Sequence, residues 1–306
     1  TVAAMAPIAI GVAEAANLNL PLTCAAVIGG AYFGDNLSMI SDTTISAAKG
    51  VGSEMKDKFR MNFLIALPAA IVAIIMYWAL GGTGVITGEH NFEIIRVIPY
   101  IIVLGAALAG FNVCGVLFTG IVMSGLIGIF EGTITILEWV QAIGSGMSDM
   151  FSITIVAILI SGLIGLIKYY GGVDWLVNSI VSRIKERKDA EYGIGLLSGL
   201  LSAALVNNTI AIIISAPIAK EIGKTYHIAP KRLASLIDIF ACAFLALTPY
   251  DGGMLIVTGL VDVSPLAVLK YSFYIFALII ATCITIQFGL LRTEEEKRYL
   301  KENNLK

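Results

Sequence analysis

The run MNFLIALPAAIVAIIMYWAL, residues 61–80, contains no charged residue and is long enough to cross a lipid bilayer as a helix. Residues 151–170 and 266–291 form two further long apolar runs, each with a single lysine. The chain of 306 residues is 58% hydrophobic and 14% charged, with a mean hydropathy of +0.88. These values exclude a water-soluble domain. Because the runs are apolar on every side, they predict an all-α integral membrane protein rather than a barrel of alternating strands.

The basic residues are unevenly distributed between the apolar runs. Eighteen of the 20 Lys and Arg residues lie in four segments, which are residues 49–60, 168–188, 220–232 and 292–306. The connections at 13–19, 81–95 and 132–148 contain none. By the positive-inside rule, the basic segments and the C-terminus are cytoplasmic and the other connections external. The predicted location is the inner (plasma) membrane of a prokaryote, in multi-pass form.

Two predicted crossings are interrupted by polar and helix-breaking residues. The crossing at 20–48 contains GDNLSMISDTT at residues 34–44, and the crossing at 233–261 contains TPYDGG at residues 248–253. Unwound backbone at membrane depth is tolerated only where protein or a water-filled cavity covers it, and carboxylates there are costly. We therefore expect discontinuous transmembrane helices that form a binding site.

Two other segments must enter and leave the membrane on one side. Residues 193–219 lie between two basic segments, and their polar centre, Val206-Asn207-Asn208-Thr209, is typical of the tip of a re-entrant hairpin. Residues 97–130 are interrupted at Gly110-Phe111-Asn112 and are predicted to form two short helices or a hairpin.

An internal repeat is indicated by two similar stretches. Ala6-Pro7-Ile8-Ala9 matches Ala216-Pro217-Ile218-Ala219, and each is followed by a loop, a proline, a helix, a polar break and a full span. The loop has no basic residue in the first copy and four in the second, so the copies are predicted to be inverted, as in secondary transporters with alternating access. We expect the counterpart of residues 97–208 to precede Thr1, which makes the first repeat N-terminally truncated. The predicted organisation is a first repeat at 1–80, two short helices and an external connection at 81–150, a second repeat at 151–291 and a cytoplasmic tail at 292–306.

The first break resembles the signature of a known family. Residues 34–44 match the pattern G-D-x-x-S-x-x-S-D-T-T of the NhaC family of sodium/proton antiporters, and residues 249–255, PYDGGML, resemble its second-half motif P-H-D-S/G-G-M-L. The resemblance covers essentially the whole chain and implies an ion-transporter fold with sodium coupling. The family also includes exchangers of malate for lactate with sodium. Tyr250 stands where many members have His, which removes a group that titrates near neutrality.

An unwound segment offers the oxygen ligands that sodium takes. We expect sodium at Asp35, Ser38, Asp42 and Thr43. The wider set of expected ion- or substrate-binding residues is Asp35, Asn36, Ser38, Ser41, Asp42, Thr43, Thr44, Asn207, Asn208, Thr209, Thr248, Asp251 and Gly252. Three alternatives stay open: that Asp35 or Asp42 caps the next half-helix, that residues 41–44 hold a substrate carboxylate at a helix N-terminus, and that Asn207–Thr209 only satisfy the broken backbone.

The candidate proton carriers are Asp35, Asp42, Asp238 and Asp251. Competition between a proton and a cation for one carboxylate gives antiport without a further device, and Asp35 or Asp42 is the favoured carrier. For Asp238 the alternative is a Ser or Lys partner near the cytoplasmic interface. His90 and His227 fall in loops on opposite faces, so a histidine relay is not expected.

Enzymatic function is not expected, because the chain has no P-loop, HExxH, GxSxG or CxxC motif. The four cysteines are scattered singly and are interpreted as packing residues, so no cofactor is expected besides sodium as coupling ion. Sodium/proton antiport is the leading hypothesis. The alternatives are sodium-coupled transport or exchange of an organic anion or amino acid, and an ion channel. Expected partners are membrane lipid, sodium, protons or a small organic substrate, and a second copy in a homodimer, but not nucleic acid.

Overall fold

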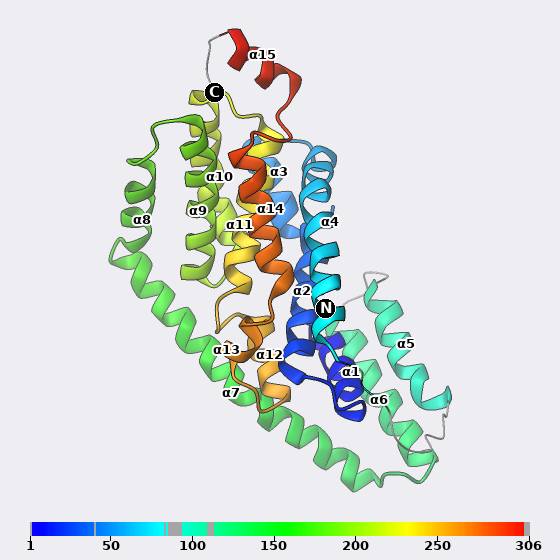
Figure 1. Cartoon of the computed structure of the whole chain (residues 1–306). Coiled ribbons are helices and arrows are strands. Elements are labelled where there is room, and N and C mark those ends of the chain that lie inside the picture. The colour runs from blue at the N-terminus through cyan, green and yellow to red at the C-terminus, as the bar shows by residue number, and fades with distance from the viewer. Residues whose placement is uncertain (1, 40, 83, 85–93, 109–112, 303–306) are drawn as a thin grey trace.

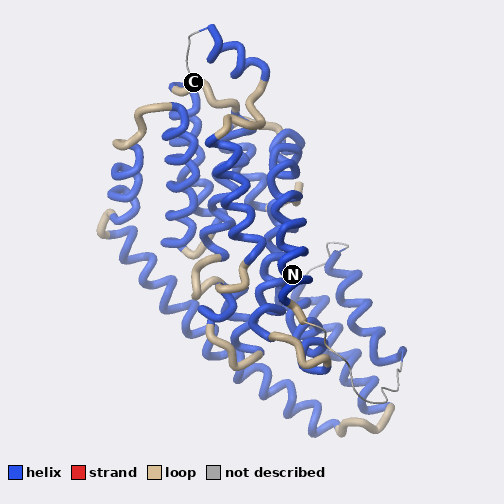
Figure 2. The backbone as a smooth tube through the Cα atoms, in the orientation of Figure 1, coloured by secondary structure: helices blue, strands red, loops and turns tan. Residues whose placement is uncertain are grey.

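The computed structural model describes all residues except 1, 40, 83, 85–93, 109–112 and 303–306. Within the described residues every regular element is a helix (Figures 1 and 2). The helices are α1 (Val2–Ala15), α2 (Leu20–Asn36), α3 (Asp42–Val51), α4 (Met55–Leu80), α5 (Ile94–Leu108), α6 (Val113–Phe130), α7 (Ile136–Tyr169), α8 (Gly172–Val181), α9 (Arg187–Leu205), α10 (Asn208–Thr225), α11 (Pro230–Ala246), α12 (Gly252–Leu260), α13 (Pro265–Leu269), α14 (Phe273–Gln287) and α15 (Glu294–Glu302). The predicted all-α class is confirmed.

The helix α4 is the one described helix that is both long and apolar enough to cross a membrane. Shorter apolar helices occur at Val2–Ala15, Gly115–Phe130 and Phe273–Gln287. Most of the apolar stretch of α4 is exposed in the isolated chain, including Ile74 and Trp78. An exposed apolar surface of this extent is typical of a surface that meets another molecule or a membrane.

The helix α11 occupies the centre of the bundle. Nearly all of its residues are buried, and it packs against α2, α3, α4, α9, α10 and α14. Two glycines of α9 allow close contact: a Cβ atom added to Gly195 would lie 2.6 Å from the Phe240 ring, and one added to Gly199 would lie 2.8 Å from the Phe244 ring. Small residues four apart let membrane helices approach in this way.

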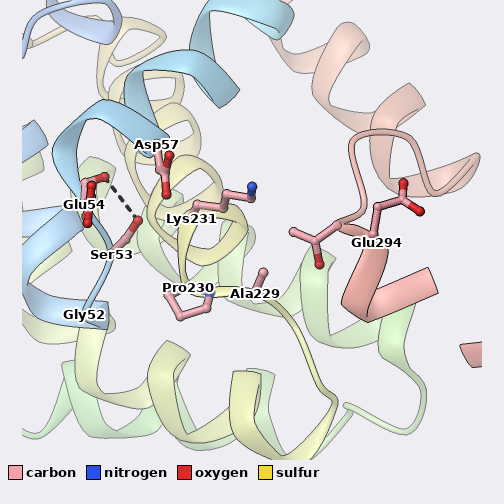
Figure 3. Close-up of a pocket in the computed structure, with 9 residues that line it drawn as sticks. Gly52, Ser53, Glu54, Asp57, Ala229, Pro230, Lys231 and Glu294 are labelled. Atoms are coloured by element: carbon pink, nitrogen blue, oxygen red, sulfur yellow. Dashed lines mark hydrogen bonds between the residues drawn. The ribbon is translucent and has the colours of Figure 1, made fainter. Parts of the chain in front are cut away.

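Parts of the four basic segments lie together at one end of the bundle, whereas Lys168, at the end of α7, lies at the other end of α8. Residues from the start of α4, the start of α11 and the start of α15 line one cavity of about 470 Å³. Figure 3 shows its lining residues, among them Glu54, Asp57, Lys231 and Glu294. Arg187, at the start of α9, donates to the His227 carbonyl at 2.6 Å. At the opposite end of the bundle, α4 contacts the turn between α13 and α14, where the Tyr77 hydroxyl donates to the Tyr271 carbonyl at 3.0 Å.

The tail, predicted at 292–306, is attached to the bundle through α15. The Glu296 carboxylate is 5% exposed and accepts hydrogen bonds from Arg187 at 2.5 Å, from Thr293 N at 2.6 Å and from Ala229 N at 2.9 Å. Burial raises the pKa of Glu296, but these hydrogen bonds and the Arg187 charge outweigh it and hold the pKa below its ordinary value. Arg232 pairs with Glu191 at 2.9 Å. Arg187 and Arg232 are thus buried partners rather than loop charges.

Two predicted spans differ from the structure. The run at 266–291 is not one helix: α13 ends at Leu269 and α14 begins at Phe273, because the chain turns at Tyr271, whose carbonyl is held by Tyr77. The predicted span at 151–170 is only the second half of α7. Its start at Ile136 is set by a capping box in which Thr135 and Glu138 satisfy each other's backbone N–H groups, in a segment predicted to be a connection. The predicted break at Gly110-Phe111-Asn112 and His90 lie outside the described residues.

The contact between Gly195 and Phe240 generates a prediction. Gly195→Ala should destabilise the protein by about 1–3 kcal/mol, because the new methyl group overpacks the α9–α11 contact. The matched control is Gly11→Ala in α1, where an added Cβ meets nothing within 4 Å. Melting temperatures of both variants in detergent provide the measurement. An unchanged value for Gly195→Ala would show that the Phe240 ring moves aside at no cost.

Candidate functional site

The structure interrupts the chain where the sequence predicts breaks. The helix α2 ends at Asn36 and α3 begins at Asp42, while α11 ends at Ala246 and α12 begins at Gly252. A third interruption separates α9, which ends at Leu205, from α10, which begins at Asn208. The interruptions predicted within residues 34–44 and 248–253 are therefore present, and a third falls at the polar stretch 206–209.

Each half-helix that follows a break is capped by a side chain. The Ser41 hydroxyl accepts from Thr44 N at 3.3 Å, the Asn207 side chain from Ile210 N at 2.8 Å, and the Asp251 carboxylate from Gly253 N at 3.1 Å. The alternative that Asp35 or Asp42 caps α3 is wrong, because Ser41 is the N-cap residue. Asp42 is the first helical residue, and one of its oxygens accepts from Thr43 N at 3.1 Å.

Asp35 lies where α2, α3 and α11 meet. The Thr43 hydroxyl donates to the two Asp35 carboxylate oxygens at 3.3 and 3.4 Å, and the Cys242 thiol donates to one of them at 3.3 Å. The Asn208 amide reaches the Cys242 sulfur at 3.6 Å, and Ser41 contacts Thr43 at 3.0 Å. Cys242 was interpreted as a packing residue, and nothing in its apolar surroundings in the sequence indicates the contact with Asp35.

The other expected site residues have different surroundings. Asp42 is exposed, and its carboxylate accepts from the Thr209 hydroxyl of α10 at 2.6 Å. Asp251 is buried beside Tyr32. Thr248, in the break after α11, donates to the Leu245 carbonyl at 2.6 Å, and Gly252 is exposed.

The expected sodium ligands are linked only in part. Thr43 is bonded to Asp35, while the Asp42 carboxylate turns to α10. The Ser38 backbone carbonyl accepts a hydrogen bond from the Thr44 hydroxyl at 2.8 Å. The Ser38 hydroxyl accepts one from Ser41 N at 3.0 Å. Within the described residues, no group of three or more His, Cys, Asp or Glu side chains could hold a metal ion.

A second polar cluster lies beside the first. The Lys58 ammonium lies 2.7 Å from an Asp238 carboxylate oxygen and donates to the Thr44 hydroxyl at 2.6 Å. The Asn62 amide donates to the same Asp238 oxygen at 2.8 Å and to the Asn36 carbonyl at 3.0 Å. All five side chains are fully buried. Asp238 therefore has the lysine partner that the sequence left open.

Lys58 is a buried charged residue of this cluster that the sequence did not indicate. It was counted among cytoplasmic loop residues, which is wrong, because it lies in the second turn of α4 with no exposed surface. A signal was available: Lys58 and Asn62 are one helical turn apart on the side of α4 that also buries Ile65 and Ala69. Extending the helical period upstream of Met61 would have placed both in the core.

Comparison with known proteins adds to this geometry. Residues 1–82 and 90–292 match the pattern of the Na+/H+ antiporter family. The chain belongs to the Na+/H+ antiporter family. The resemblance to NhaC and the prediction of a sodium-coupled secondary transporter are thereby confirmed. No solved structure matches this family member.

Similar curated proteins carry several antiporter names. The chain is 26% identical to the Na(+)/H(+) antiporter NhaC of Bacillus subtilis, over 95% of this chain and 71% of the relative. It is 23% identical to the malate-2H(+)/Na(+)-lactate antiporter of the same organism, over 99% and 70%. It is 21% identical to the arginine/ornithine antiporter ArcD of Halobacterium salinarum, over 86% and 62%.

The buried pair generates a stability prediction. Asp238→Asn should destabilise this antiporter by about 3–5 kcal/mol, because Lys58 is left charged and without a counter-charge in the core. The double variant Lys58→Met with Asp238→Asn should recover most of that loss. Melting temperatures in detergent are the measurement, with Asp262→Asn, an exposed residue, as the control. A melting temperature of Asp238→Asn equal to that of the wild type would show that the pair is not needed for stability.

Proposed function

We propose that this chain exchanges sodium for protons by alternating access, with the ion bound at the break between α2 and α3. The observation that carries the proposal is the Asp35 carboxylate, half-buried among Thr43, Cys242 and the broken end of its own helix. A carboxylate at such a place is costly unless it binds something. Binding of the exchanged ion would compensate for the free-energy cost of placing the Asp35 carboxylate there.

The chemistry follows from the groups around the break. Asp35 supplies a negative charge, and Ser41, Thr43 and the Ser38 backbone supply neutral oxygens within the same short segment. Sodium accepts such oxygens, and a proton can take its place on the carboxylate. Because one carboxylate holds either ion but not both, the two ions would cross in opposite directions. Asp42 and Thr209 would form the part of the site nearer to the α9–α10 hairpin.

The arrangement of the two breaks supports the inverted repeat. A shift of 210 residues carries α2 onto α11, both of 17 residues, and carries the break at 37–41 onto that at 247–251. The same shift brings Pro7 onto Pro217 and the N-cap residue Ser41 onto the N-cap residue Asp251. In Figure 1 the α2–α3 segment runs toward the end that carries α15, whereas the α11–α12 segment runs away from it. Opposite directions are what inverted repeats require.

The α9–α10 hairpin supports re-entry into the membrane. Arg187 at its start lies against Tyr226 and His227 just after its end, so both limbs meet at one end of the bundle, while Thr209 at its tip reaches the first break. At the tip, Val206 has φ +49°, a left-handed conformation that strains a β-branched residue. Such strain is concentrated at functional sites. With the basic end cytoplasmic by the positive-inside rule, the hairpin would enter from the cytoplasm and the C-terminus would lie there too.

An alternative is sodium-coupled exchange of an organic anion or amino acid. Tyr250 is exposed at the second break, where the NhaC motif often has a titratable His. Two relatives are named for such exchange, one of malate and lactate and one of arginine and ornithine. The exposed N-terminus of α12 at Gly252 would be one contact for a carboxylate.

Transport by the purified protein in proteoliposomes tests the proposal. A sodium gradient should drive protons in the opposite direction, as reported by a pH-sensitive dye. Asp35→Asn and Asp42→Asn should each reduce this exchange at least about tenfold, because the exchanged charge is lost. Glu14→Gln, at an exposed position, is the matched control.

The outcomes separate the candidates. Sodium-driven proton movement that Asp42→Asn leaves unchanged would remove that carboxylate from the mechanism. Uptake of malate, lactate, arginine or ornithine with sodium, in the absence of sodium-driven proton movement, would favour the alternative. Unsaturable ion flux without counter-transport would indicate a channel.

A further inference from the structure

Two buried side chains on the interrupted helices donate hydrogen bonds to carboxylates at the breaks. The Cys242 thiol of α11 donates at 3.3 Å to Asp35, which lies at the end of α2. The Tyr32 hydroxyl of α2 donates to Asp251, which lies in the break after α11. Each donor is therefore on one interrupted helix, and its acceptor is at the break of the other.

The two donors occupy equivalent places in their helices. Tyr32 is the thirteenth residue of α2, counted from Leu20, and Cys242 is the thirteenth residue of α11, counted from Pro230. The shift of 210 residues that carries α2 onto α11 thus carries one donor onto the other. It does not carry Asp35 onto Asp251, so the crossed arrangement arises from how the helices pack and not from copied sequence.

Both hydrogen bonds lie in one neighbourhood that is closed to water. Tyr32, Cys242 and Asp251 are buried, and Tyr32 also lies within electrostatic range of Cys242 and Asp35. The helix α2 packs against both α11 and α12. Hydrogen bonds to an ionised carboxylate are stronger than those between neutral groups, and without competing water they fix its orientation.

The contact of Tyr32 with Asp251 also fixes Asp35. Tyr32 precedes Asp35 by three residues, so the two side chains lie on the same side of α2. Anchoring Tyr32 to the N-cap residue of α12 holds the last turn of α2 in place. The orientation of Asp35 therefore depends on both donors, directly on Cys242 and through the helix on Tyr32.

The thiol is itself held from the hairpin tip. The Asn208 amide, at the start of α10, reaches the Cys242 sulfur at 3.6 Å. The thiol donates to one Asp35 oxygen only. An ionised carboxylate has about four lone-pair positions, so acceptor capacity is left for a cation while the thiol bond is kept.

We propose that Cys242 and Tyr32 are positioning residues of the ion site, and that together they hold the Asp35 carboxylate in the orientation in which it binds sodium. This inference rests on the sodium/proton exchange proposed above and names two further residues for the same site. Each residue acts through the carboxylate that it holds. Neither is a ligand of the ion.

A positioning role and a structural role have different kinetic consequences. Without a donor, the carboxylate must be reoriented each time sodium binds, so the KM for sodium rises. Once sodium is bound, the site is the same as in the wild type, so the maximal rate is kept. Side chains that only stabilise the fold would change the melting temperature and leave the KM unaltered.

The test measures sodium-driven proton movement in proteoliposomes over a series of sodium concentrations at one pH. Tyr32→Phe should raise the KM for sodium about tenfold, the effect of losing one hydrogen bond to a charged group. Cys242→Ala should raise it about threefold, because a thiol is a weaker donor than a hydroxyl. Cys242→Ser should have a KM no higher than that of the wild type, because the hydroxyl donates to the same oxygen.

Two matched controls remove the same groups elsewhere. Tyr77→Phe deletes a hydroxyl that donates to the Tyr271 carbonyl at the far end of α4, and Cys24→Ala deletes a buried thiol in α2. Both should keep the wild-type KM, whatever their effect on the melting temperature.

The outcomes decide between the two roles. A wild-type KM in Tyr32→Phe would overturn the inference, as would a KM in Cys242→Ser raised as far as in Cys242→Ala. If Cys242→Ala does not fold, Tyr32→Phe and Cys242→Ser decide. Either overturning result in a chain whose wild type exchanges sodium for protons refutes this inference alone.

Thermal stabilisation by sodium in detergent gives an apparent affinity that does not depend on transport. If sodium stabilises the wild type but drives no proton movement, the proposed exchange fails, and the apparent affinities of the same variants decide the inference. If sodium neither drives proton movement nor stabilises the wild type, both proposals fail.

Discussion

The central constraint in this protein is one ion pair without access to water, between the Lys58 ammonium and the Asp238 carboxylate at 2.7 Å. Neither charge could remain in the core without the other. The pair therefore fixes α4 against α11, and α11 is the helix on which most of the bundle packs. Through Thr44 and Asn62 the same pair also holds the broken ends of α2 and α3.

The breaks are stable because the chain satisfies its own exposed backbone. Ser41, Asn207 and Asp251 accept hydrogen bonds from the first N–H groups of α3, α10 and α12, which would otherwise be unpaired. Since these caps come from side chains within the breaks, the Asp35 carboxylate is not needed for capping. A polar segment inside an apolar bundle can then hold a charge for another purpose.

The local features of the site were predicted well from the sequence, and its partners were not. The interruptions near Asp35 and Asp251 and the polar hairpin tip were predicted, because clusters of glycine, proline and short polar side chains favour a break in a helix. The start of α7 was not predicted, although its capping box at Thr135 and Glu138 is local. The predicted span followed the apolar run at 151–170, which begins 15 residues after Ile136. At the split between α13 and α14, the Tyr271 carbonyl accepts from the Tyr77 hydroxyl, which comes from a distant part of the chain.

The sequence by itself determined the all-α class, the places where helices break and the family to which the chain belongs, because hydropathy and helix-breaking chemistry act between near neighbours. Only the tertiary structure decided that Cys242 faces Asp35, 207 positions away, and that Asn62 and Lys58 face Asp238, which is 176 positions after Asn62. It also decided that Lys58 is a core residue rather than a loop charge. Such contacts depend on how whole helices pack, and no local pattern encodes which faces will meet.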